Sequence, residues 1–492
     1  MKDYILAIDQ GTTGSTTLLV DEKLGIHAKT TVDFPQHFPK PGWVEHDAEE
    51  IWFSVTQAIR RTLEAAGVKG AQIAAIGITN QRETTLLWDR ASGAPAGHAV
   101  VWQDRRTSDI CEQLRHQELE PLFRRKTGLI FDPYFSGTKL TWLLRQDAEL
   151  RRRAENGKIA FGTVDSFLVW RLTGGKSHVT DASNASRTLM MGLESGQWDE
   201  ELCRHLEVPS AILPEIRPSS DLYGHTSGLA CLPDGIPVCG MAGDQQAALF
   251  GQACFTPGES KCTYGTGAFL LANTGAEIVH SDSGLLTTVA WQLPNGTTYA
   301  LEGSAFIAGA AVQWLRDGLG LIGSAANIEA MAASVPDSGG VVFVPALTGL
   351  GAPHWRSGAR GLVCGITRGT TAAHLARATL EGIALQIHDL MQAMNRDRGM
   401  PISELKVDGG AARNDLLMQL QADLSGRPVI RPQTVETTAL GAAMLAGLSA
   451  GFWAGTDSLK TAWQQERRFE PQMAETEKKG LLARWQEALE KA

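Results

Sequence analysis

The strongest constraint on the fold is a pair of glycine- and threonine-rich segments that lie about half the chain apart. The first reads Asp9-Gln-Gly-Thr-Thr-Gly-Ser15 and stands between the apolar runs 4–8 and 16–20. The second reads Thr263-Tyr-Gly-Thr-Gly267 and also joins two apolar runs. Glycine lets a backbone approach phosphate oxygens, and successive N–H groups in a tight turn form an anion-binding nest. Each segment alone is equally consistent with an ordinary hairpin turn, but the pair predicts a duplicated fold that grips phosphate from two sides.

The remaining pattern predicts an α/β architecture. Apolar runs that suit strands alternate with helical segments, among them 48–65 and 371–394. A chain of 492 residues is too long for one ordinary core. We therefore expect two lobes, 1–250 and 251–492, with no Pro- or Ser-rich linker between them. Asp47 and Glu50 fit a capping box at the start of the first helix.

Two further motifs follow predicted strands. In Gly243-Asp-Gln-Gln-Ala247, the carboxylate of Asp244 is a candidate general base next to a substrate-binding amide. The structural alternative for this residue is an N-cap aspartate. Asp408-Gly-Gly-Ala-Ala-Arg-Asn414 lies between a predicted strand and a predicted helix, and its glycines leave room for a base or a ribose. The alternative for this second motif is a loop that only leads into a helix.

Two familiar nucleotide-binding signatures do not apply. Gly318-Leu-Gly-Leu-Ile-Gly323 matches G-x-G-x-x-G, but it follows an apparent helix, 308–316, where a dinucleotide site needs a strand. We expect a helix C-cap and a loop there. The sequence contains no G-x-x-x-x-G-K-[ST], so the paired turns are the predicted phosphate-binding elements.

Charge and composition exclude several classes of partner. With 45 Lys and Arg against 54 Asp and Glu, the net charge of −9 disfavours a polyanion such as a nucleic acid. The sequence contains no run of about 18 apolar residues, which is the length that a membrane-spanning helix needs. The seven cysteines are odd in number and form no C-x-x-C pair, which indicates reduced thiols. We expect a cytoplasmic protein that neither binds nucleic acid nor inserts into a membrane.

Together these motifs resemble the actin-like ATPase superfamily and, within it, the FGGY carbohydrate kinases, above all the members that phosphorylate glycerol. The resemblance covers almost the whole chain. Beyond the paired turns, it is carried by 41–47, 80–83, 102–106, 134–142, 242–251, 361–366 and 374–381. It implies two ribonuclease-H-like (actin/Hsp70-type) lobes with a catalytic cleft between them, and a homodimer or homotetramer. It further implies ATP-dependent phosphorylation of glycerol to sn-glycerol 3-phosphate, in glycerol uptake and catabolism.

The resemblance assigns a role to each candidate residue. Asp244 is the expected general base, and Asp9 would hold Mg²⁺, through a water molecule. The polyol would be hydrogen-bonded by Arg82, Glu83, Tyr134, Asp244 and Gln245, and covered by Trp102 and Phe269. ATP would be held by Thr12, Thr13, Gly14, Thr266, Gly309, Gln313, Gly410, Ala411 and Asn414. Polar groups for the hydroxyls and apolar walls for the carbons suit glycerol. The alternative for the two aromatic residues and for Gly309 is that they serve only in packing.

Three positions depart from the pattern of that family. Thr16 stands where glycerol-phosphorylating members commonly carry Arg, and Gly14 stands where many carry Ser. Some bacterial members bind fructose 1,6-bisphosphate through a Gly-rich loop that contains Arg. The matching segment, 228–235, contains neither Arg nor Lys. We therefore expect control by the bisphosphate to be weak or absent.

Three alternatives to a glycerol-phosphorylating enzyme are open at this stage. A kinase of the same fold could act on another polyol or a ketose, which Arg82, Glu83 and Trp102 disfavour. An actin- or Hsp70-like ATPase would use its nucleotide cycle for polymerisation or partner binding, which the Gly-Asp-Gln motif disfavours. A catalytically silent binding protein is disfavoured because both Asp9 and Asp244 are present.

Overall fold

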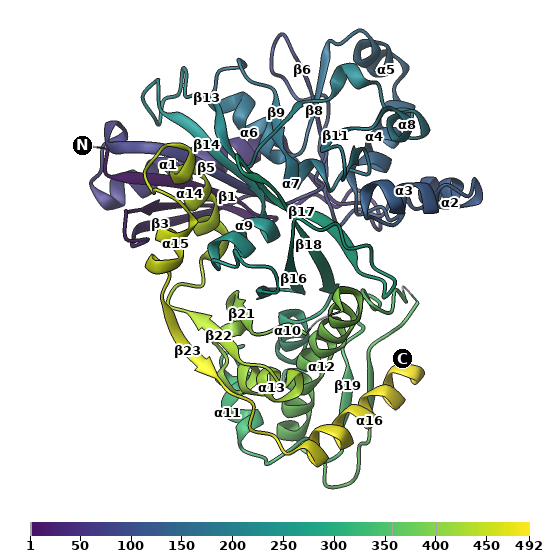
Figure 1. Ribbon diagram of the computed structural model, residues 1–492. Helices are drawn as coiled ribbons and strands as arrows, with labels where there is room; N and C mark the ends of the chain where they lie inside the picture. Colours follow the sequence, from purple (N-terminus) through teal and green to yellow (C-terminus); the bar gives the residue numbers. More distant parts are fainter. Residues whose placement is uncertain (1, 357, 400) are drawn as a thin grey trace.

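The computed structural model describes residues 2–356, 358–399 and 401–492, and it shows two α/β units (Figure 1). The upper unit in Figure 1 is built on a six-stranded sheet, and the lower unit on a seven-stranded sheet. The chain starts in the upper unit and ends in the lower one. The predicted class, an α/β fold with two lobes, is confirmed.

The first sheet has the strand order β13-β14-β5-β1-β2-β3. Its strands are β1 (Tyr4–Gln10), β2 (Gly14–Val20), β3 (Ile26–Asp33), β5 (Ile73–Asn80), β13 (Ser220–His225) and β14 (Pro237–Gly243). Strand β2 is antiparallel to both of its neighbours, β1 and β3, whereas β5 runs parallel to both β1 and β14. The predicted strands 4–8 and 16–20 are therefore the hairpin β1–β2, and the first Gly/Thr segment is its turn.

The second sheet repeats this plan, with the order β17-β18-β16-β15-β21-β22-β23. Its strands are β15 (Ser260–Tyr264), β16 (Ala268–Gly275), β17 (Leu286–Leu293), β18 (Gly296–Ala305), β21 (Leu405–Asp408), β22 (Val429–Pro432) and β23 (Gln465–Phe469). The hairpin β15–β16 is antiparallel, and β15 runs parallel to β21 as β1 does to β5. The second Gly/Thr segment is the turn of this hairpin, so the expected duplication is present.

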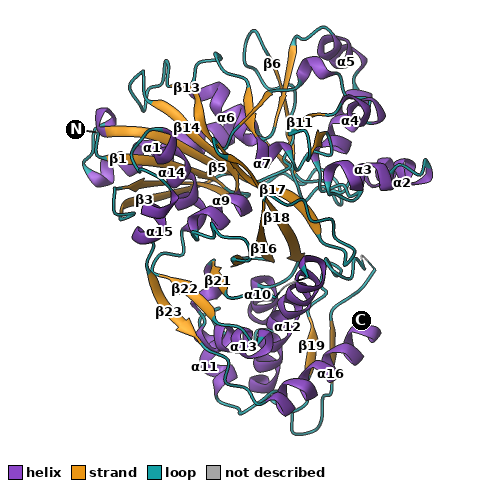
Figure 2. Ribbon diagram, in the orientation of Figure 1, coloured by secondary structure: helices purple, strands orange, loops and turns teal. Residues whose placement is uncertain are grey.

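Helices cover the sheets (Figure 2). Helices α1 (Ala48–Ala66) and α6 (Val164–Leu172) share a core cluster with the first sheet, and α9 (Asp244–Gly251) and α14 (Thr437–Ser449) share a second one with it. One continuous cluster joins the second sheet to its own helices. These are α10 (Gly309–Asp317), α11 (Asn327–Ala333), α12 (Ala372–Arg398), α13 (Asp415–Ser425) and α16 (Glu475–Lys491).

The other elements are mostly short and many lie in the upper unit. They are β4 (Glu45–His46), β6 (Leu86–Asp89), β7 (Ala99–Val100), β8 (Ile159–Gly162), β9 (Val179–Asp181), β10 (Met191–Gly192), β11 (Gln197–Trp198), β12 (Glu215–Arg217), β19 (Val342–Val344), β20 (Leu362–Cys364), α2 (Ser108–His116), α3 (Glu120–Thr127), α4 (Ser136–Gln146), α5 (Ala148–Glu155), α7 (Ala182–Ala185), α8 (Glu200–His205) and α15 (Thr456–Ala462). Within the described ranges, every helix is too short or too polar to cross a bilayer. All seven cysteines are free thiols, and five of them are buried.

Helix α14 belongs to the late part of the chain but lies on the first sheet, where Figure 1 shows its yellow-green ribbon over the purple strands. Three glycines make this contact possible. A Cβ atom added to Gly441 would lie 1.8 Å from the carbonyl oxygen of Ala247, and one added to Gly251 would lie 2.0 Å from that of Thr437. On the sheet side, a Cβ added to Gly77 would lie 2.1 Å from a carbonyl oxygen of α14. Backbones therefore touch directly between α9, α14 and β5. The predicted boundary near residue 250 stays a prediction.

Asp408, at the end of β21, ties this contact to the second sheet. Its buried carboxylate accepts hydrogen bonds from Gln252 Nε2, at 2.8 Å, and from Thr437 Oγ1, at 2.7 Å. The first donor directly follows α9, and the second is the first residue of α14. The side chain of Asp408 therefore links α9 and α14 to β21.

Two predicted helix ends can be compared with the structure. Asp47 is the N-cap of α1, as expected, and accepts a hydrogen bond from the N–H of Glu49. The expected capping box is wrong, because the carboxylate of Glu50 instead bonds to His37 Nε2, at 2.9 Å. Helix α10 ends at a C-cap formed by Gly318, so the G-x-G-x-x-G segment follows a helix as predicted.

Candidate active site

Each Gly/Thr turn is closed by a backbone hydrogen bond between two glycines, across three residues in the first turn and two in the second. In the first, the N–H of Gly11 donates to the carbonyl of Gly14 at 2.9 Å. In the second, the N–H of Gly265 donates to the carbonyl of Gly267, also at 2.9 Å. Thr266, at the tip of the second turn, is exposed, as Thr13 is in the first. The two exposed threonine side chains carry hydroxyl groups of the kind that bind phosphate oxygens.

Three of the predicted nucleotide-binding segments meet at the second turn. The N–H of Gly309, which opens α10, donates to the carbonyl of Gly265 at 2.9 Å, and a Cβ at Gly309 would lie 2.6 Å from that oxygen. Gly409 has φ 85°, and a Cβ there would lie 2.6 Å from the carbonyl oxygen of Tyr264. Both positions thus need glycine for close approach. Exposed Gln313 and Gly410 extend from these contacts into solvent-accessible space.

Asn414 and Ala411 belong to the same loop. The side chain of Asn414 is the N-cap of α13, and its Oδ1 accepts from the N–H of Leu417 at 2.9 Å. Ala411 lies on the short 3-10 helix Gly410–Arg413 and is half-buried. The alternative for this motif, a loop that only leads into a helix, therefore accounts for the Oδ1 atom of Asn414. Its amide nitrogen is not part of that cap.

The predicted polyol residues gather around Arg82. Its Nη2 donates to the hydroxyl of Tyr134 at 3.0 Å, and its Nε lies 3.3 Å from Asp244 Oδ1. The ring of Tyr134 meets the ring of Trp102 edge-on, with centroids 5.7 Å apart. Glu83 is the next residue along the chain, and it adopts a left-handed backbone conformation with φ 58°. A non-glycine residue in this region is strained, and such strain gathers at functional sites.

Two side chains of the following segment hold the backbone of Glu83 in this conformation. Its carbonyl accepts from Ser136 Oγ at 3.0 Å and from Lys139 Nζ at 3.3 Å. The same ammonium group also bonds to the carbonyl of Tyr134. Burial lowers the pKa of Lys139 to about 8. The segment 134–139 therefore fixes two predicted polyol ligands at once.

Asp244 is the first residue of α9, directly after β14. The N-cap is Gly243, so the structural alternative of an N-cap aspartate is not what the structure shows. Its Oδ1 accepts from the N–H of Gln245 at 2.7 Å, and its side chain is 32% exposed. A carboxylate at a helix N-terminus, partly open to solvent and next to Arg82, is available to accept a proton.

A hydrogen bond connects the polyol residues to the first turn. Trp102 Nε1 donates to Thr12 Oγ1 at 2.9 Å. Trp102 is half-buried, and its structural alternative, a plain core aromatic, does not account for this polar contact. Phe269 is half-buried at the other hairpin, where it pairs with Thr263 in the strand register. The structure therefore brings Trp102, a predicted wall of the polyol pocket, against the predicted phosphate turn.

Asp9 is the second-to-last residue of β1, next to the first turn. Burial, and the negative charges of Asp244 and Glu436, raise its pKa to about 7. Lys29 lowers it, but by less. Burial and the two neighbouring carboxylates therefore outweigh Lys29 at this site.

Two positions on the first hairpin, Thr16 and Gly14, depart from the family pattern, and the structure shows which residues surround them. Thr16 Oγ1 lies 2.8 Å from Thr31 Oγ1 on the neighbouring strand and faces solvent. A Cβ at Gly14 would lie 2.8 Å from a carboxylate oxygen of Asp33. The side chain of Asp33 therefore occupies space that a larger residue at position 14 would need.

Three buried charged residues were not predicted from the sequence. Glu302, on β18, bonds to Arg82, and Arg187, just after α7, bonds to both Glu302 and Glu83. Lys261, on β15, donates to Gln245 Oε1 at 2.5 Å and to Thr263 Oγ1 at 2.8 Å. For Glu302 and Lys261 the available signal was a charged residue inside a strand, which is typical of a paired or functional position, whereas Arg187 lies outside any strand and had no such signal.

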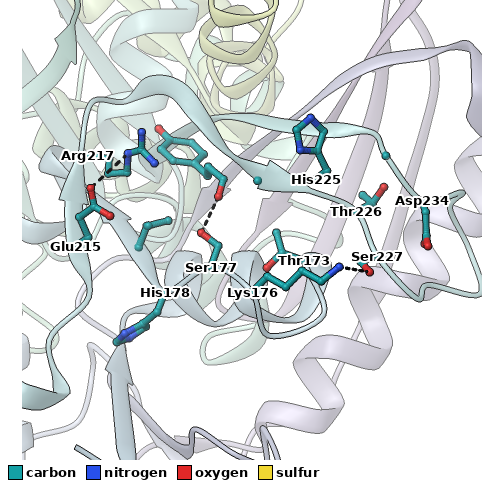
Figure 3. A pocket seen from close by; sticks show the side chains of 14 residues that line it. Thr173, Lys176, Ser177, His178, Glu215, Arg217, His225, Thr226, Ser227 and Asp234 are labelled. Carbon is teal, nitrogen blue, oxygen red and sulfur yellow. Dashed lines mark hydrogen bonds and ion pairs between the residues drawn. The ribbon is translucent and has the colours of Figure 1, made fainter.

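A cavity of about 690 Å³ lies elsewhere in the upper unit (Figure 3). It is lined by the segments 173–179, 215–217, 223–227 and 234–235, and so lies apart from the predicted site. Lys176 Nζ donates to Ser227 Oγ at 3.1 Å, and Arg217 is 2.8 Å from Asp221 Oδ2. Asp234, from the loop 228–235, adds a carboxylate to the cavity.

Comparisons with known proteins place this chain among sugar and polyol kinases. Residues 4–251 match the N-terminal domain of the FGGY family of carbohydrate kinases, and residues 260–450 match its C-terminal domain. A glycerol kinase of Myxococcus xanthus is 61% identical, over 99% of each chain. One from Bdellovibrio bacteriovorus is 56% identical, over 100% of this chain and 99% of the relative.

A solved structure supports the same assignment. The crystal structure of Plasmodium falciparum glycerol kinase with ADP superposes with a TM-score of 0.92 at 36% identity, covering 99% of this chain and 98% of that one. The two family models together match most of the chain, and a relative that matches over its full length is more than half identical to it. This chain therefore belongs to the FGGY family of carbohydrate kinases.

Proposed function

We propose that this chain transfers the terminal phosphate of ATP to a hydroxyl of glycerol, which gives sn-glycerol 3-phosphate. One observation carries the proposal. Asp244 lies beside Arg82, Tyr134 and Trp102, and Trp102 is bonded to Thr12 of a phosphate-type turn. A candidate base, side chains that can hydrogen-bond hydroxyls and a candidate phosphate turn are thus adjacent. The relatives and the ADP-bound structure described above are named glycerol kinases.

The residues suggest how the reaction proceeds. Asp244 accepts the proton of the attacking hydroxyl, while Arg82, Glu83, Tyr134 and Gln245 bind the polyol hydroxyls. The aromatic walls, Trp102 and Phe269, cover the carbons. The two turns hold the phosphates in line with the attacking oxygen, because phosphoryl transfer is catalysed mainly by positioning and charge stabilisation. Enclosing the site matters since water is a competing acceptor.

Mg²⁺ fits this chemistry at Asp9. Burial is the main cause of the raised pKa of its carboxyl, and the carboxylates of Asp244 and Glu436 add to it, so oxygen ligands of the kind that Mg²⁺ prefers lie in its surroundings. Asp9 would hold the ion through a water molecule. When bound, the ion supplies charge neutralisation at the phosphates. The protein's own part is to place the carboxylate at the end of β1, beside the first turn.

The test of the proposed function is ADP release from MgATP. Glycerol, erythritol, dihydroxyacetone, xylulose, ribulose and no acceptor are compared in parallel. We expect a large rate that depends on glycerol, with little release in its absence. Preference for a ketose would keep the chemistry and overturn the polyol assignment, and release that is indifferent to every acceptor would indicate an ATPase instead.

We infer that fructose 1,6-bisphosphate controls this enzyme weakly or not at all. The loop 228–235 lacks Arg and Lys, and its Asp234 faces the neighbouring cavity. Arg217, also in that cavity, is already paired with Asp221. A bisphosphate there would meet a carboxylate and would lack a bidentate arginine partner.

We expect the glycerol-dependent rate to be unchanged at millimolar fructose 1,6-bisphosphate, measured over a range of protein concentrations. The matched variant is Asp234→Arg, which replaces the carboxylate by a guanidinium and should increase any inhibition. Strong inhibition of the unmodified enzyme would contradict the inference.

The family resemblance also supports a homodimer or homotetramer that works in the cytoplasm. Sedimentation at several protein concentrations tests the oligomeric state directly.

A further inference from the structure

Four buried charged side chains connect the two units beside the polyol pocket. They are Arg82, Glu83, Arg187 and Glu302, and each is at most 2% exposed. The first three come from the upper unit, whereas Glu302 lies on β18 of the second sheet. Buried charges of this kind persist only when they are paired with good geometry.

Glu302 is the centre of this group. Its Oε2 accepts from Arg82 Nη1 at 2.5 Å, and its Oε1 accepts from Arg82 Nη2 at 3.0 Å. The same Oε1 accepts from Arg187 Nη2 at 2.9 Å. Burial raises the pKa of Glu302, but the guanidinium groups of Arg187 and Arg82 outweigh it and hold the pKa at about 2. A bidentate Arg–carboxylate pair also fixes the plane of the guanidinium.

Arg187 extends this control to Glu83. Its Nε donates to Glu83 Oε1 at 2.8 Å, while its Nη1 finds no partner among the described residues. The guanidinium is therefore held on two edges, by one glutamate from each unit. Both predicted polyol ligands, Arg82 and Glu83, thus depend on contacts that lead to Glu302.

The pairing also affects Asp244. Its Oδ1 lies 3.3 Å from Arg82 Nε, and the forked end of the guanidinium is taken by Glu302. Glu83 Oε1 lies farther from Arg82 Nε, at 3.7 Å, and is held by Arg187, so a free fork would be open to Asp244. An aspartate held in such a bidentate pair would be a poor proton acceptor.

We propose that Glu302 is a positioning residue for polyol recognition: it holds Arg82 directly, and Glu83 through Arg187, in their binding orientations, and it keeps Arg82 from capturing Asp244. This inference rests on the proposed function and deepens it. The polyol pocket is then completed by a residue of the second sheet. Its selectivity for a triol depends on how the two units are joined.

The test compares Glu302→Gln with the unmodified enzyme. Glutamine keeps the shape of the side chain but removes the charge and points N–H groups at a guanidinium. We expect kcat/KM for glycerol to fall on the order of 10²-fold, as expected for a misplaced binding group. The preference for glycerol over 1,2-propanediol should shrink as well, because the lost contact is specific to hydroxyls. ATP affinity, measured by calorimetry, should be unchanged.

Tyr299→Phe is the matched control. Tyr299 lies on the same strand, and its hydroxyl donates to the carbonyl of Leu193 in the upper unit at 3.0 Å. Removing it weakens a contact between the units without touching Arg82. We expect this variant to keep the ratio of glycerol to 1,2-propanediol use. If it lost that ratio as Glu302→Gln does, a general packing role would replace the proposal.

A second variant covers the case in which Glu302→Gln does not fold. Arg187→Gln combined with Glu302→Gln removes one charge of each sign and restores balance. We expect this double variant to fold and bind ATP, but to discriminate poorly between the triol and the diol. Wild-type selectivity in either variant would overturn the positioning role. Absence of glycerol-dependent turnover in the unmodified enzyme would instead overturn the proposed function.

Discussion

Replacing Asp244 by asparagine should lower the turnover of glycerol on the order of 10²- to 10⁴-fold while ATP still binds. Asparagine keeps the size of the side chain but cannot accept the proton of the attacking hydroxyl. The fold should survive, because Arg82 remains paired with Glu302 and the side chain at position 244 is partly exposed. The measurement is the rate of ADP release at saturating glycerol and MgATP, with ATP affinity measured separately by calorimetry.

Asp221→Asn is the matched control for this prediction. It removes a carboxylate in the same unit. This carboxylate pairs with Arg217, outside the predicted polyol pocket. We expect its turnover to equal that of the unmodified enzyme. If Asp244→Asn also turned over at a near-normal rate, the base would have to be another group.

Gly441→Ala should destabilise the enzyme on the order of 4 kcal/mol or more, which places it among the most damaging single substitutions. A Cβ there would lie 1.8 Å from the carbonyl oxygen of Ala247, and this contact joins the backbones of α14 and α9. A backbone carbonyl cannot rotate away as a flexible side chain would. Helix α9 would have to move, and with it Asp244, its first residue.

The measurement for this variant is the melting temperature together with the yield of folded protein. A fitted free energy would be a poor readout, since two units need not unfold as one. Gly455→Ala is the control, because it adds the same methyl group at an extended residue with open space around it. We expect the control to melt as the unmodified enzyme does. A normal melting temperature for Gly441→Ala would show that the helices do not pack as described.

The elements that carry local signals could be predicted from the sequence. The hairpins around both Gly/Thr turns are marked by apolar runs next to glycine, so their positions followed from neighbouring residues alone. Trp102 and Asp244 could be assigned because whole motifs around them resemble one family. In each case the information lies within a few residues of the predicted feature.

Contacts between distant segments could not be predicted in this way. Glu302 lies 220 positions after Arg82, and nothing near either residue specifies the pairing. Glu50 illustrates the same limit at short range, because its spacing fitted a capping box while His37, from a preceding loop, bonds to it. The path of α14 onto the first sheet depends on which glycines face each other, and only the folded arrangement determines that.

Asp408 and Asp244 should have different evolutionary fates. Asp408 accepts hydrogen bonds from Gln252 and Thr437, and so serves the architecture whether or not the enzyme turns over. Asp244, as the proposed base, would serve the chemistry alone. In a lineage that abandoned phosphoryl transfer but kept the fold, position 244 would drift, whereas position 408 would stay an aspartate. On this proposal, the aspartate of the Asp-Gly-Gly motif would mark descent, and the aspartate at the start of α9 would mark activity.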